Sequence, residues 1–218
     1  IASTTLTGSN ADIIGDALAS VLRQVDRCIV IDTGAQDDTV DVARRVAGDK
    51  LLLHRFPWKD DFAAARNFAL GAAAKAGATW ALTLDTDERL LFDRDFDLAR
   101  ALARTQAQVC MVADDVGSYS KERIVRLPAK VRWEGPTHEC LMGRTAAGTL
   151  NLRGVRFHEL PKDPDGIRRK FERDVAILKR YTRQHAKQAR WFYYLGASHQ
   201  HLGEFAAAID AFQACAEL

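Results

Sequence analysis

The chain has 218 residues, of which 47% are hydrophobic and 28% charged, so its composition is that of a globular protein and excludes disorder. Lys and Arg number 31 against 29 Asp and Glu, which argues against a basic field for nucleic acid or an anionic membrane. No apolar stretch approaches the ~20 residues that a membrane helix needs, and the first residues lack a signal-peptide layout. We expect a cytoplasmic protein with no nucleic-acid partner and no integral membrane segment.

Apolar runs alternate with helical spacings over the first half of the chain, a pattern typical of parallel strands joined by crossover helices. Apolar side chains recur at Ile14, Leu18 and Val21, for example, as on one face of an amphipathic helix. The pattern predicts an α/β fold with a nucleotide-binding half. We expect strands over residues 1–6, 28–31, 51–54, 80–84 and 109–113, and helices over residues 11–25, 39–46 and 62–76.

The motif Asp85-Thr86-Asp87 follows a short apolar run and places two carboxylates one residue apart. A buried strand that ends there delivers both acids to the carboxyl edge of the sheet, where open α/β folds bind ligands. Hard oxygen ligands suit Mg²⁺ or Mn²⁺, and these ions keep positions open for substrate phosphates. The motif therefore predicts a divalent cation carrying a diphosphate, and the alternative is a solvated acidic turn.

The segment Asp32-Thr33-Gly34 ends the second expected strand. A carboxylate at a strand end can accept hydrogen bonds from a base or ribose, and glycine permits close backbone approach. An ordinary turn is an equal alternative for Asp32, and we expect Asp38 to cap the next helix. The sequence has no GxGxxG or GxxxxGK[ST] pattern, which weighs against a dehydrogenase or P-loop enzyme.

A succession of motifs then resembles a known family. The motifs are CIVIDTGAQDDT (28–39), FPWKDDFAAARNF (56–68), LDTDE (84–88) and WEGPTHE (133–139). Together they resemble family 2 glycosyltransferases, and most closely the bacterial subgroup whose catalytic domain is followed by tetratricopeptide helices. The resemblance implies a GT-A fold, with a mainly parallel sheet that binds a nucleotide-sugar, over residues 1–160, and a helical extension over residues 161–218.

The resemblance also implies a nucleotide site and a donor. It makes Asp32, with Thr33 and Gly34, a contact for the nucleobase. The donor it implies is a nucleoside-diphosphate sugar, above all a UDP-sugar. Arg66 and Asn67 match the family's Arg-Asn pair, which could orient the base, the Asp-x-Asp loop or the diphosphate; a solvated or ion-paired arginine is the alternative.

The metal, Mn²⁺ or Mg²⁺, is implied at the Asp-x-Asp. The match puts Asp85 and Asp87 at the ribose, metal and diphosphate, with Asp87 the firmer metal ligand. His158 ends another apolar run and matches a strand-end histidine of the family, so it could complete the metal sphere. A lone histidine is more often structural, and both interpretations stay open.

The family position for the catalytic base is reached in the His138-Glu139 pair. An inverting transfer needs a base near the acceptor, and a carboxylate suits that role if partial burial raises its pKa. Glu139 is the preferred base. In the alternative, Glu139 binds sugar hydroxyls and Asp114 or Asp115 transfers the proton.

One segment departs from the family pattern. The family usually carries a Lys-Asn-Glu-like sequence after the first strand, whereas this chain has Gly8, Ser9 and Asn10 there. These residues still offer hydrogen bonds to a base or phosphate, but the loss of the charged pair puts the nucleotide contact in question.

The pattern changes beyond Pro161. Residues 162–166 are predicted to be a turn-rich linker, and residues 167–185 a charged helix with a solvated basic face. The last segment fits one tetratricopeptide unit with Gly203 at its turn. Because a single repeat cannot bury both faces, we expect a truncated array or a homodimer through these helices; a lid on the catalytic domain is the alternative.

We therefore expect a metal-dependent, inverting glycosyltransferase that moves a sugar from a nucleoside diphosphate to a peptide, protein or saccharide acceptor. A sugar-phosphate nucleotidyltransferase is the competing enzyme, although the basic glycine-rich loop typical of that class is missing. A weakened transferase that serves as a helical-repeat adaptor is the competing binding protein. It predicts a retained fold without metal-dependent donor binding.

Overall fold

The structure is a computed structural model that describes all residues 1–218, and it divides into two compact units. The sheet unit consists of Ile1–Lys59, Ala63–Glu134 and Leu141–Leu160. The helical unit consists of Asp60–Phe62, Gly135–Cys140 and Pro161–Leu218. Two short segments from the first 160 residues therefore group with the C-terminal helices.

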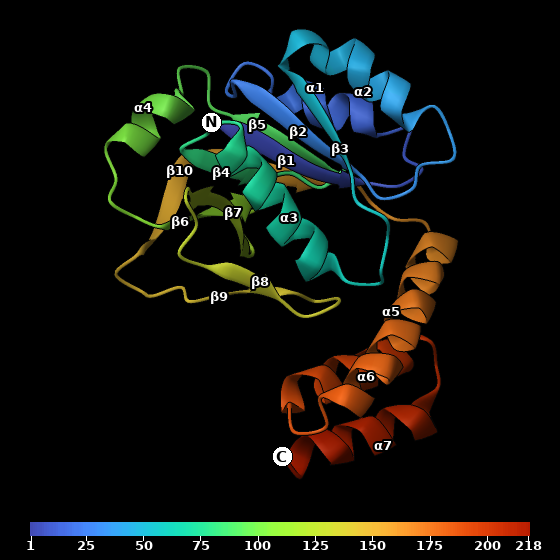
Figure 1. Ribbon diagram of the computed structural model, residues 1–218. Helices are drawn as coiled ribbons and strands as arrows, with labels where there is room; N and C mark the ends of the chain where they lie inside the picture. Colours follow the sequence, from blue (N-terminus) through green and yellow to red (C-terminus); the bar gives the residue numbers. More distant parts are fainter. The chain divides into compact units, whose positions relative to one another are not determined.

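An eight-stranded sheet in the order β3-β2-β1-β4-β7-β6-β10-β5 forms the centre of the sheet unit (Figure 1). The strands β3, β2, β1 and β4 are all parallel, whereas β7 and β5 run antiparallel to their neighbours. The predicted α/β architecture is confirmed, and the expected mainly parallel sheet is parallel in its first half and mixed beyond it. The strands are β1 (Ala2–Thr7), β2 (Arg27–Asp32), β3 (Leu51–Arg55), β4 (Trp80–Thr83), β5 (Glu88–Phe92), β6 (Val109–Asp114), β7 (Ser120–Arg126) and β10 (Thr149–Glu159).

Helices cover both faces of this sheet because its strands are apolar on both sides. In β2, Cys28 and Val30 enter the core with α1 (Ile14–Val21), α2 (Thr39–Ala47) and α4 (Leu98–Ala103). Ile29 and Ile31 enter the opposite core with α3 (Phe62–Lys75). Full burial of such a side chain stabilises the fold by about 1.5–3 kcal/mol. A single turn, η1 (Gly48–Lys50), and a two-stranded sheet of β8 (Arg132–Glu134) and β9 (Cys140–Met142) complete the elements.

The structure corrects two local predictions. The side chain of Asp38 makes no capping hydrogen bond, and Asp37 instead accepts one from Thr39 N at 3.1 Å. The expected linker over residues 162–166 is already helical from Pro164, because proline suits a first turn in which its missing N–H has no intrahelical partner. Asp163 caps that turn by accepting from Gly166 N.

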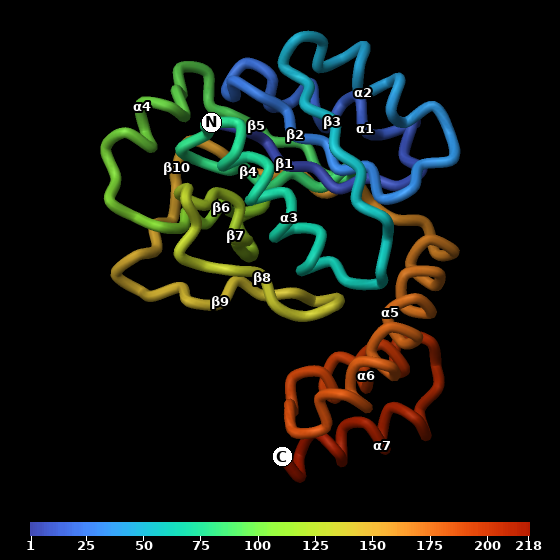
Figure 2. Tube along the Cα trace, in the orientation of Figure 1, coloured from blue at the N-terminus to red at the C-terminus, as the bar shows by residue number.

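The helical unit is built from α5 (Pro164–Gln184), α6 (Ala189–His201) and α7 (Phe205–Ala216), which follow one another along the chain (Figure 2). Gly203, in the left-handed region with φ +76°, makes the predicted turn between α6 and α7. No helix combines the length and the apolar character that a membrane crossing requires. The core of the unit contains Val175, Leu178, Trp191, Leu195 and Ala211.

Candidate functional site

The loop after β1 and the turn after β2 are joined by hydrogen bonds. The backbone N–H and the hydroxyl of Thr33 both donate to Thr7 O at 2.8 Å, and Gln36 N donates to Ser9 Oγ at 3.0 Å. Parallel strands bring both segments to the same carboxyl edge of the sheet. This edge is where the sequence predicts the nucleobase.

Asp32 holds the turn together. Its Oδ1 accepts from the backbone N–H groups of Gly34 and Ala35, both at 2.8 Å. The side chain is therefore a turn former, as one of the two sequence interpretations has it. Because the turn uses only Oδ1, the same carboxylate retains Oδ2 for a ligand donor.

Neutral hydrogen bonds fix the loop that lacks the family's charged pair. Asn10 Oδ1 accepts from Gly8 N at 3.3 Å, and Asn10 N donates to Thr39 Oγ1 at 2.7 Å. The loop is thus anchored to the start of α2 without Lys or Glu.

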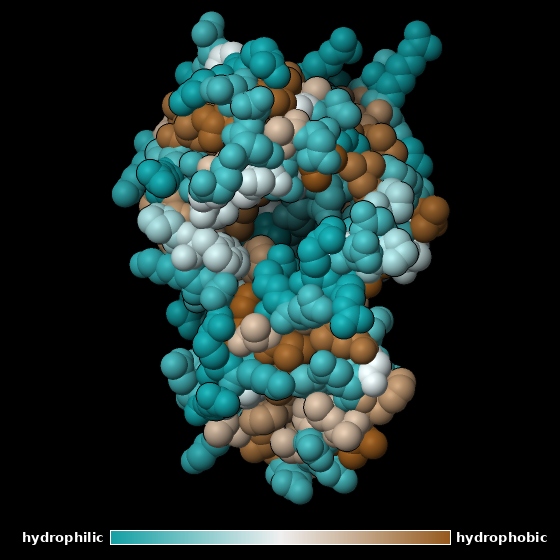
Figure 3. All heavy atoms as spheres, turned by 90° about the vertical axis from the view of Figure 1, so that its right-hand side faces the viewer, coloured by the Kyte–Doolittle hydropathy of each residue, from teal (hydrophilic) through white to brown (hydrophobic).

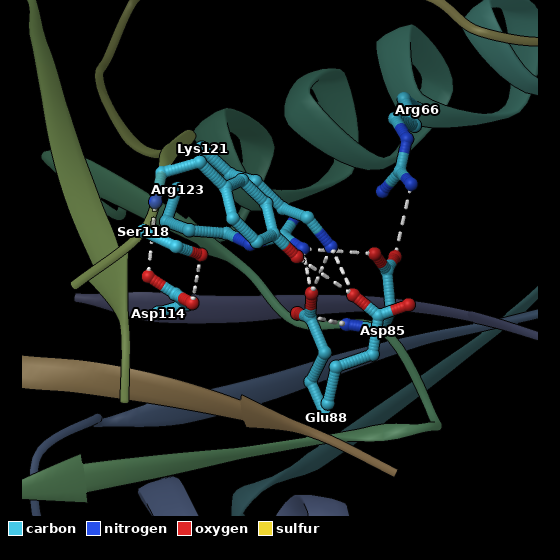
Figure 4. A network of polar contacts seen from close by, with 9 residues as sticks. Arg66, Asp85, Glu88, Asp114, Ser118, Lys121 and Arg123 are labelled. Atoms are coloured by element: carbon cyan, nitrogen blue, oxygen red, sulfur yellow. Dashed lines mark hydrogen bonds and ion pairs between the residues drawn. The ribbon is translucent and has the colours of Figure 1, made fainter. Parts of the chain in front are cut away.

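Asp85 lies at the end of β4 between two guanidinium groups (Figure 4). Arg66 on α3 donates from Nη2 to Asp85 Oδ1 at 2.9 Å, and Arg123 on β7 donates from Nη2 to Asp85 Oδ2 at 3.0 Å. Each carboxylate oxygen therefore already has a charged partner. Arg123 is only 4% exposed at its side chain, so its pair with Asp85 is screened little by water.

The cluster continues to Glu88, whose side chain is completely buried at the start of β5. Arg123 forms an ion pair with Glu88, and Lys121 Nζ donates to Glu88 Oε1 at 2.9 Å. Lys121 also donates to Glu159 Oε2 at 2.8 Å. We call Arg66, Asp85, Glu88, Lys121, Arg123 and Glu159 the charged cluster.

Opposing forces set the protonation of the two buried acids. Burial raises the pKa of Asp85, but the charges of Arg66 and Arg123 outweigh it and hold that pKa well below the ordinary value of 3.8. Burial and the negative charge of Asp85 raise the pKa of Glu88 above its ordinary 4.5, against the lowering effect of Arg123 and Lys121. Asp85 is thus the firmly ionised member of the pair.

The other member of the predicted Arg-Asn pair has a structural contact. Asn67 donates from Nδ2 to Trp133 O and accepts from Trp133 N at its Oδ1, both at 2.9 Å. These two bonds reproduce the backbone pairing of a neighbouring strand and fix β8 against α3. Arg66 is ion-paired with Asp85, which fits both its predicted contact with the Asp-x-Asp loop and the alternative of an ion-paired arginine, whereas Asn67 holds β8.

The three predicted metal ligands each contact different partners. Both oxygens of Asp85 face arginines, and His158 Nδ1 lies 2.6 Å from Asp115 Oδ2. Asp87 is partly exposed after β4, and its backbone carbonyl accepts from Leu160 N at 2.8 Å. The structure contains no group of three His, Cys, Asp or Glu side chains placed to hold a metal ion.

The candidate bases fall in different units. Asp114 and Asp115 belong to the sheet unit, where Asp114 accepts from Ser118 Oγ at 2.6 Å and Tyr119 N at 3.1 Å. Burial raises the pKa of Asp114, yet these two bonds lower it overall, so Asp114 is a weak proton acceptor. Glu139 is partly exposed and belongs to the helical unit.

Sequence reasoning missed Glu88, Lys121 and Arg123. Lys121 and Arg123 alternate along β7, so they share one face of the strand, and a buried strand with two cations on one face was the available signal. The antiparallel pairing of β7 with β4 places that face beside Asp85, and one sequence does not reveal this pairing.

A parallel half-sheet with polar loops at its carboxyl edge and an arginine-paired Asp85 defines an α/β protein whose candidate ligand site lies at that edge. The sequence profile of Glycosyl transferase family 2 matches residues 7–148, more than half of the chain. The chain therefore belongs to glycosyltransferase family 2, and the predicted family is confirmed.

Two curated proteins have sequences similar to this chain. A TPR repeat-containing protein of Synechococcus elongatus is 38% identical over 135 residues, which cover 59% of this chain and 32% of the relative. The glycosyltransferase SunS of Bacillus subtilis is 24% identical over 208 residues, covering 90% of this chain and 48% of SunS. The chain thus spans about a third to a half of the length of these curated relatives.

Solved structures support the fold. The crystal structure of S. aureus TarS has a TM-score of 0.55 at 13% identity, covering 99% of this chain and 54% of TarS. TarS 1-349 in complex with UDP has a TM-score of 0.53 at 12% identity, covering 99% of this chain and 90% of that one. The predicted GT-A fold is confirmed by this likeness together with the family match.

Proposed function

We propose that this chain transfers a sugar from a nucleoside-diphosphate donor, a UDP-sugar, to a peptide, protein or saccharide acceptor. The observation that carries the proposal is Asp85 between Arg66 and Arg123 at the carboxyl end of β4, in a chain of family 2. TarS 1-349, which shares the fold, has been crystallised with UDP and with UDP-GlcNAc, which supports a uridine nucleotide as the donor to test first. Family membership also favours glycosyl transfer over sugar-phosphate nucleotidyl transfer.

The nucleotide end of the donor would use the first two loops. Asp32 would accept hydrogen bonds from the base or the ribose at Oδ2, because Oδ1 is used by the turn. Thr33 and Gly34 would allow the backbone to approach the nucleotide closely. The rigid Gly8-Ser9-Asn10 loop offers neutral hydrogen bonds beside them. In this proposal these contacts would hold the nucleotide in place of the family's charged pair.

The diphosphate would use the charged cluster. Guanidinium groups match phosphate oxygens in geometry, and Arg66 and Arg123 are held in place by Asp85 before any substrate arrives. Preorganised cations stabilise the charge that develops on the diphosphate as the sugar leaves. In this proposal Asp85 orients the arginines toward the leaving group, and, because the three cations of the cluster are paired with three acids, additional positive charge is supplied by the metal.

The carboxylates at this edge would suit a divalent cation that is held mainly by the phosphate oxygens of the substrate. Mg²⁺ and Mn²⁺ are commonly bound by one or two carboxylates plus phosphate oxygens. Asp87 is the proposed protein ligand because the family resemblance implies it as the firmer metal ligand; Asp85 contacts Arg66 and Arg123, and His158 contacts Asp115. A bound divalent cation would supply further neutralisation of the diphosphate charge.

Acceptor activation is assigned to Glu139. In an inverting transfer one base removes the acceptor proton as the new glycosidic bond forms on the opposite face of the sugar from the departing diphosphate. The lowered pKa of Asp114 makes it the weaker candidate. We retain Glu139 as the proposed base because the family resemblance reaches the base at this position.

Titration with UDP, with and without Mn²⁺, tests the proposal on the wild type and on Asp87→Ala. We expect Mn²⁺ to tighten UDP binding about tenfold or more in the wild type and not in Asp87→Ala. Asp95→Ala, an exposed acid of the same unit, serves as the matched control and should bind as the wild type does. Absence of nucleotide binding would favour the adaptor, and metal-independent binding would remove the cation from the proposal.

Association through the helical unit forms the last part of the proposal. Tyr193, Phe205 and Ile209 are exposed on α6 and α7, and apolar side chains are visible among polar ones on the surface (Figure 3). Apolar residues four apart lie on one helix face, as Phe205 and Ile209 do. We assign this face to a homodimer, which sedimentation of the wild type and of Ile209→Asp tests: the variant should sediment as a monomer.

A further inference from the structure

The loop that carries Glu139 belongs to the helical unit. It connects β8 to β9 and consists of residues 135–139, and these residues group with α5–α7 and not with the sheet. The helices therefore contact the segment to which the proposed base belongs. Three independent contacts define how they hold it.

The first contact is a completely buried carboxylate on α5. Asp174 Oδ1 accepts from the hydroxyl of Thr137 at 3.0 Å, and Asp174 Oδ2 lies 3.5 Å from His138 Nε2. Lys170 Nζ, at 2.8 Å, and Arg173 Nη2, at 3.3 Å, complete its partners. A buried acid with a hydrogen bond to Thr137 and a longer contact to His138 fixes that loop, because its removal would leave the buried Thr137 hydroxyl without its partner.

The second contact is made by α6 on His138. The imidazole stacks on Tyr194 with ring centroids 4.2 Å apart and an angle of 6° between the planes, and Arg190 Nη2 donates to His138 O at 3.0 Å. His138 has φ +49°, a left-handed conformation that is uncommon outside glycine and persists where surroundings enforce it. His138, the residue immediately before Glu139, is thus held by contacts to both its side chain and its backbone.

The third contact is steric. Gly135, with φ +102°, lies so close to α6 that a Cβ there would come within 2.1 Å of the Trp191 ring. Trp191 is 3% exposed and belongs to the core of the helical unit. The beginning of the loop is therefore pressed onto a ring that the helices themselves hold in place.

From these contacts we infer that Asp174, Tyr194 and Trp191 are positioning residues that hold residues 135–139 in the conformation that presents Glu139. The helices then fix the conformation of the loop that contains the proposed base. The inference rests on the proposed function in one respect, the role of Glu139 as the base. We call the fixing of this loop by the helices the clamp. The clamp is inferred only from contacts within the helical unit.

Hydrogen exchange on the full chain tests whether the helices fix the loop, and kinetics test whether this matters for catalysis. Thr137→Val removes the hydroxyl that Asp174 binds and leaves α5 intact, whereas Asp174→Ala removes the acid itself. In both variants we expect the amides of Gly135, Thr137, His138 and Glu139 to exchange about tenfold faster or more. We also expect kcat for UDP release from UDP-GlcNAc with acceptor to fall about tenfold or more, with the Kd for UDP unchanged.

Controls exclude a general loss of structure. Thr137→Ser, which keeps the hydroxyl, should restore loop protection and kcat, and Asp210→Asn, an exposed acid on α7, should resemble the wild type. Wild-type exchange of the loop in both Thr137→Val and Asp174→Ala overturns the clamp. Faster exchange with an unchanged kcat overturns its role in catalysis. If the wild type itself neither binds UDP nor transfers sugar, the proposed function fails, and the exchange result still decides the clamp.

Discussion

Arg123 Nη2 lies 3.0 Å from Asp85 Oδ2, although 38 residues separate them along the chain. The antiparallel pairing of β7 with β4 makes this contact, and the same guanidinium pairs with Glu88. One buried arginine is therefore shared by Asp85, the first acid of the Asp-x-Asp motif, and by Glu88. The motif is consequently part of an ion-pair network and not an isolated acidic turn.

Arg123→Met is expected to destabilise the chain strongly, because it leaves Asp85 and Glu88 short of their shared cation. Removal of one partner of a buried ion pair lowers the free energy of unfolding by about 3–5 kcal/mol. Urea denaturation measures the change. The exposed Arg94→Met should stay within about 0.5 kcal/mol of the wild type, and a similar small change for Arg123→Met would show that the pair contributes little.

Sequence patterns predicted the first half of the fold well because each element there is local. Apolar spacing locates the strands and helices from β1 to β4, and each residue at a strand end can be assigned to the carboxyl edge. The second half depends on pairing between distant strands, and no local pattern specifies that β7 lies beside β4. Asp85 was therefore predictable, whereas its partner Arg123 was not.

The same reason explains the loop around Glu139. The motif WEGPTHE marks it in sequence, but Asp174 and Tyr194 lie more than 30 residues further along α5 and α6. Their spacing along those helices is that of ordinary packing and polar positions. Only the folded helical unit shows that Asp174 binds Thr137.

Glu139→Gln tests the proposed base directly. The amide keeps the size of the side chain but cannot accept the proton, so we expect kcat to fall about 10²- to 10⁴-fold with UDP binding retained. Asp114→Asn and Asp115→Asn, made in parallel, should transfer sugar at rates close to the wild type. Undiminished turnover by Glu139→Gln together with loss of turnover by either aspartate variant would transfer the role to that aspartate.

Gly135→Ala is expected to destabilise the helical unit by two effects. A Cβ at this position requires a strained backbone and also meets the Trp191 ring. Gly203→Ala in the same unit has φ +76° but open space around it, so it reports the backbone effect alone, about 1–2 kcal/mol. We expect Gly135→Ala to lose about 1–3 kcal/mol more in thermal or urea unfolding. Equal losses of stability in the two variants would mean that the Trp191 ring moves aside at no cost in free energy.

Acid should weaken the helical unit through Asp174. Burial raises the pKa of Asp174, but hydrogen bonds from His138 and Lys170 and the charges of Lys170 and Arg173 hold it below the ordinary value of 3.8. A folded-state pKa below the unfolded one means that the ionised carboxylate stabilises the fold above about pH 4. That stabilisation is lost as the pH falls through 3.8 towards the folded value.

The comparison of wild type with Asp174→Asn isolates this effect, because asparagine cannot ionise. Urea unfolding at pH 6, 4 and 3 should show a gap in stability between the two proteins that is largest at pH 6 and narrows steadily between pH 4 and pH 3. Asp210→Asn, exposed on α7, should show no such narrowing. A constant gap would mean that Asp174 contributes its hydrogen bonds but not its charge, and a gap that widens in acid would reverse the assigned direction of its pKa.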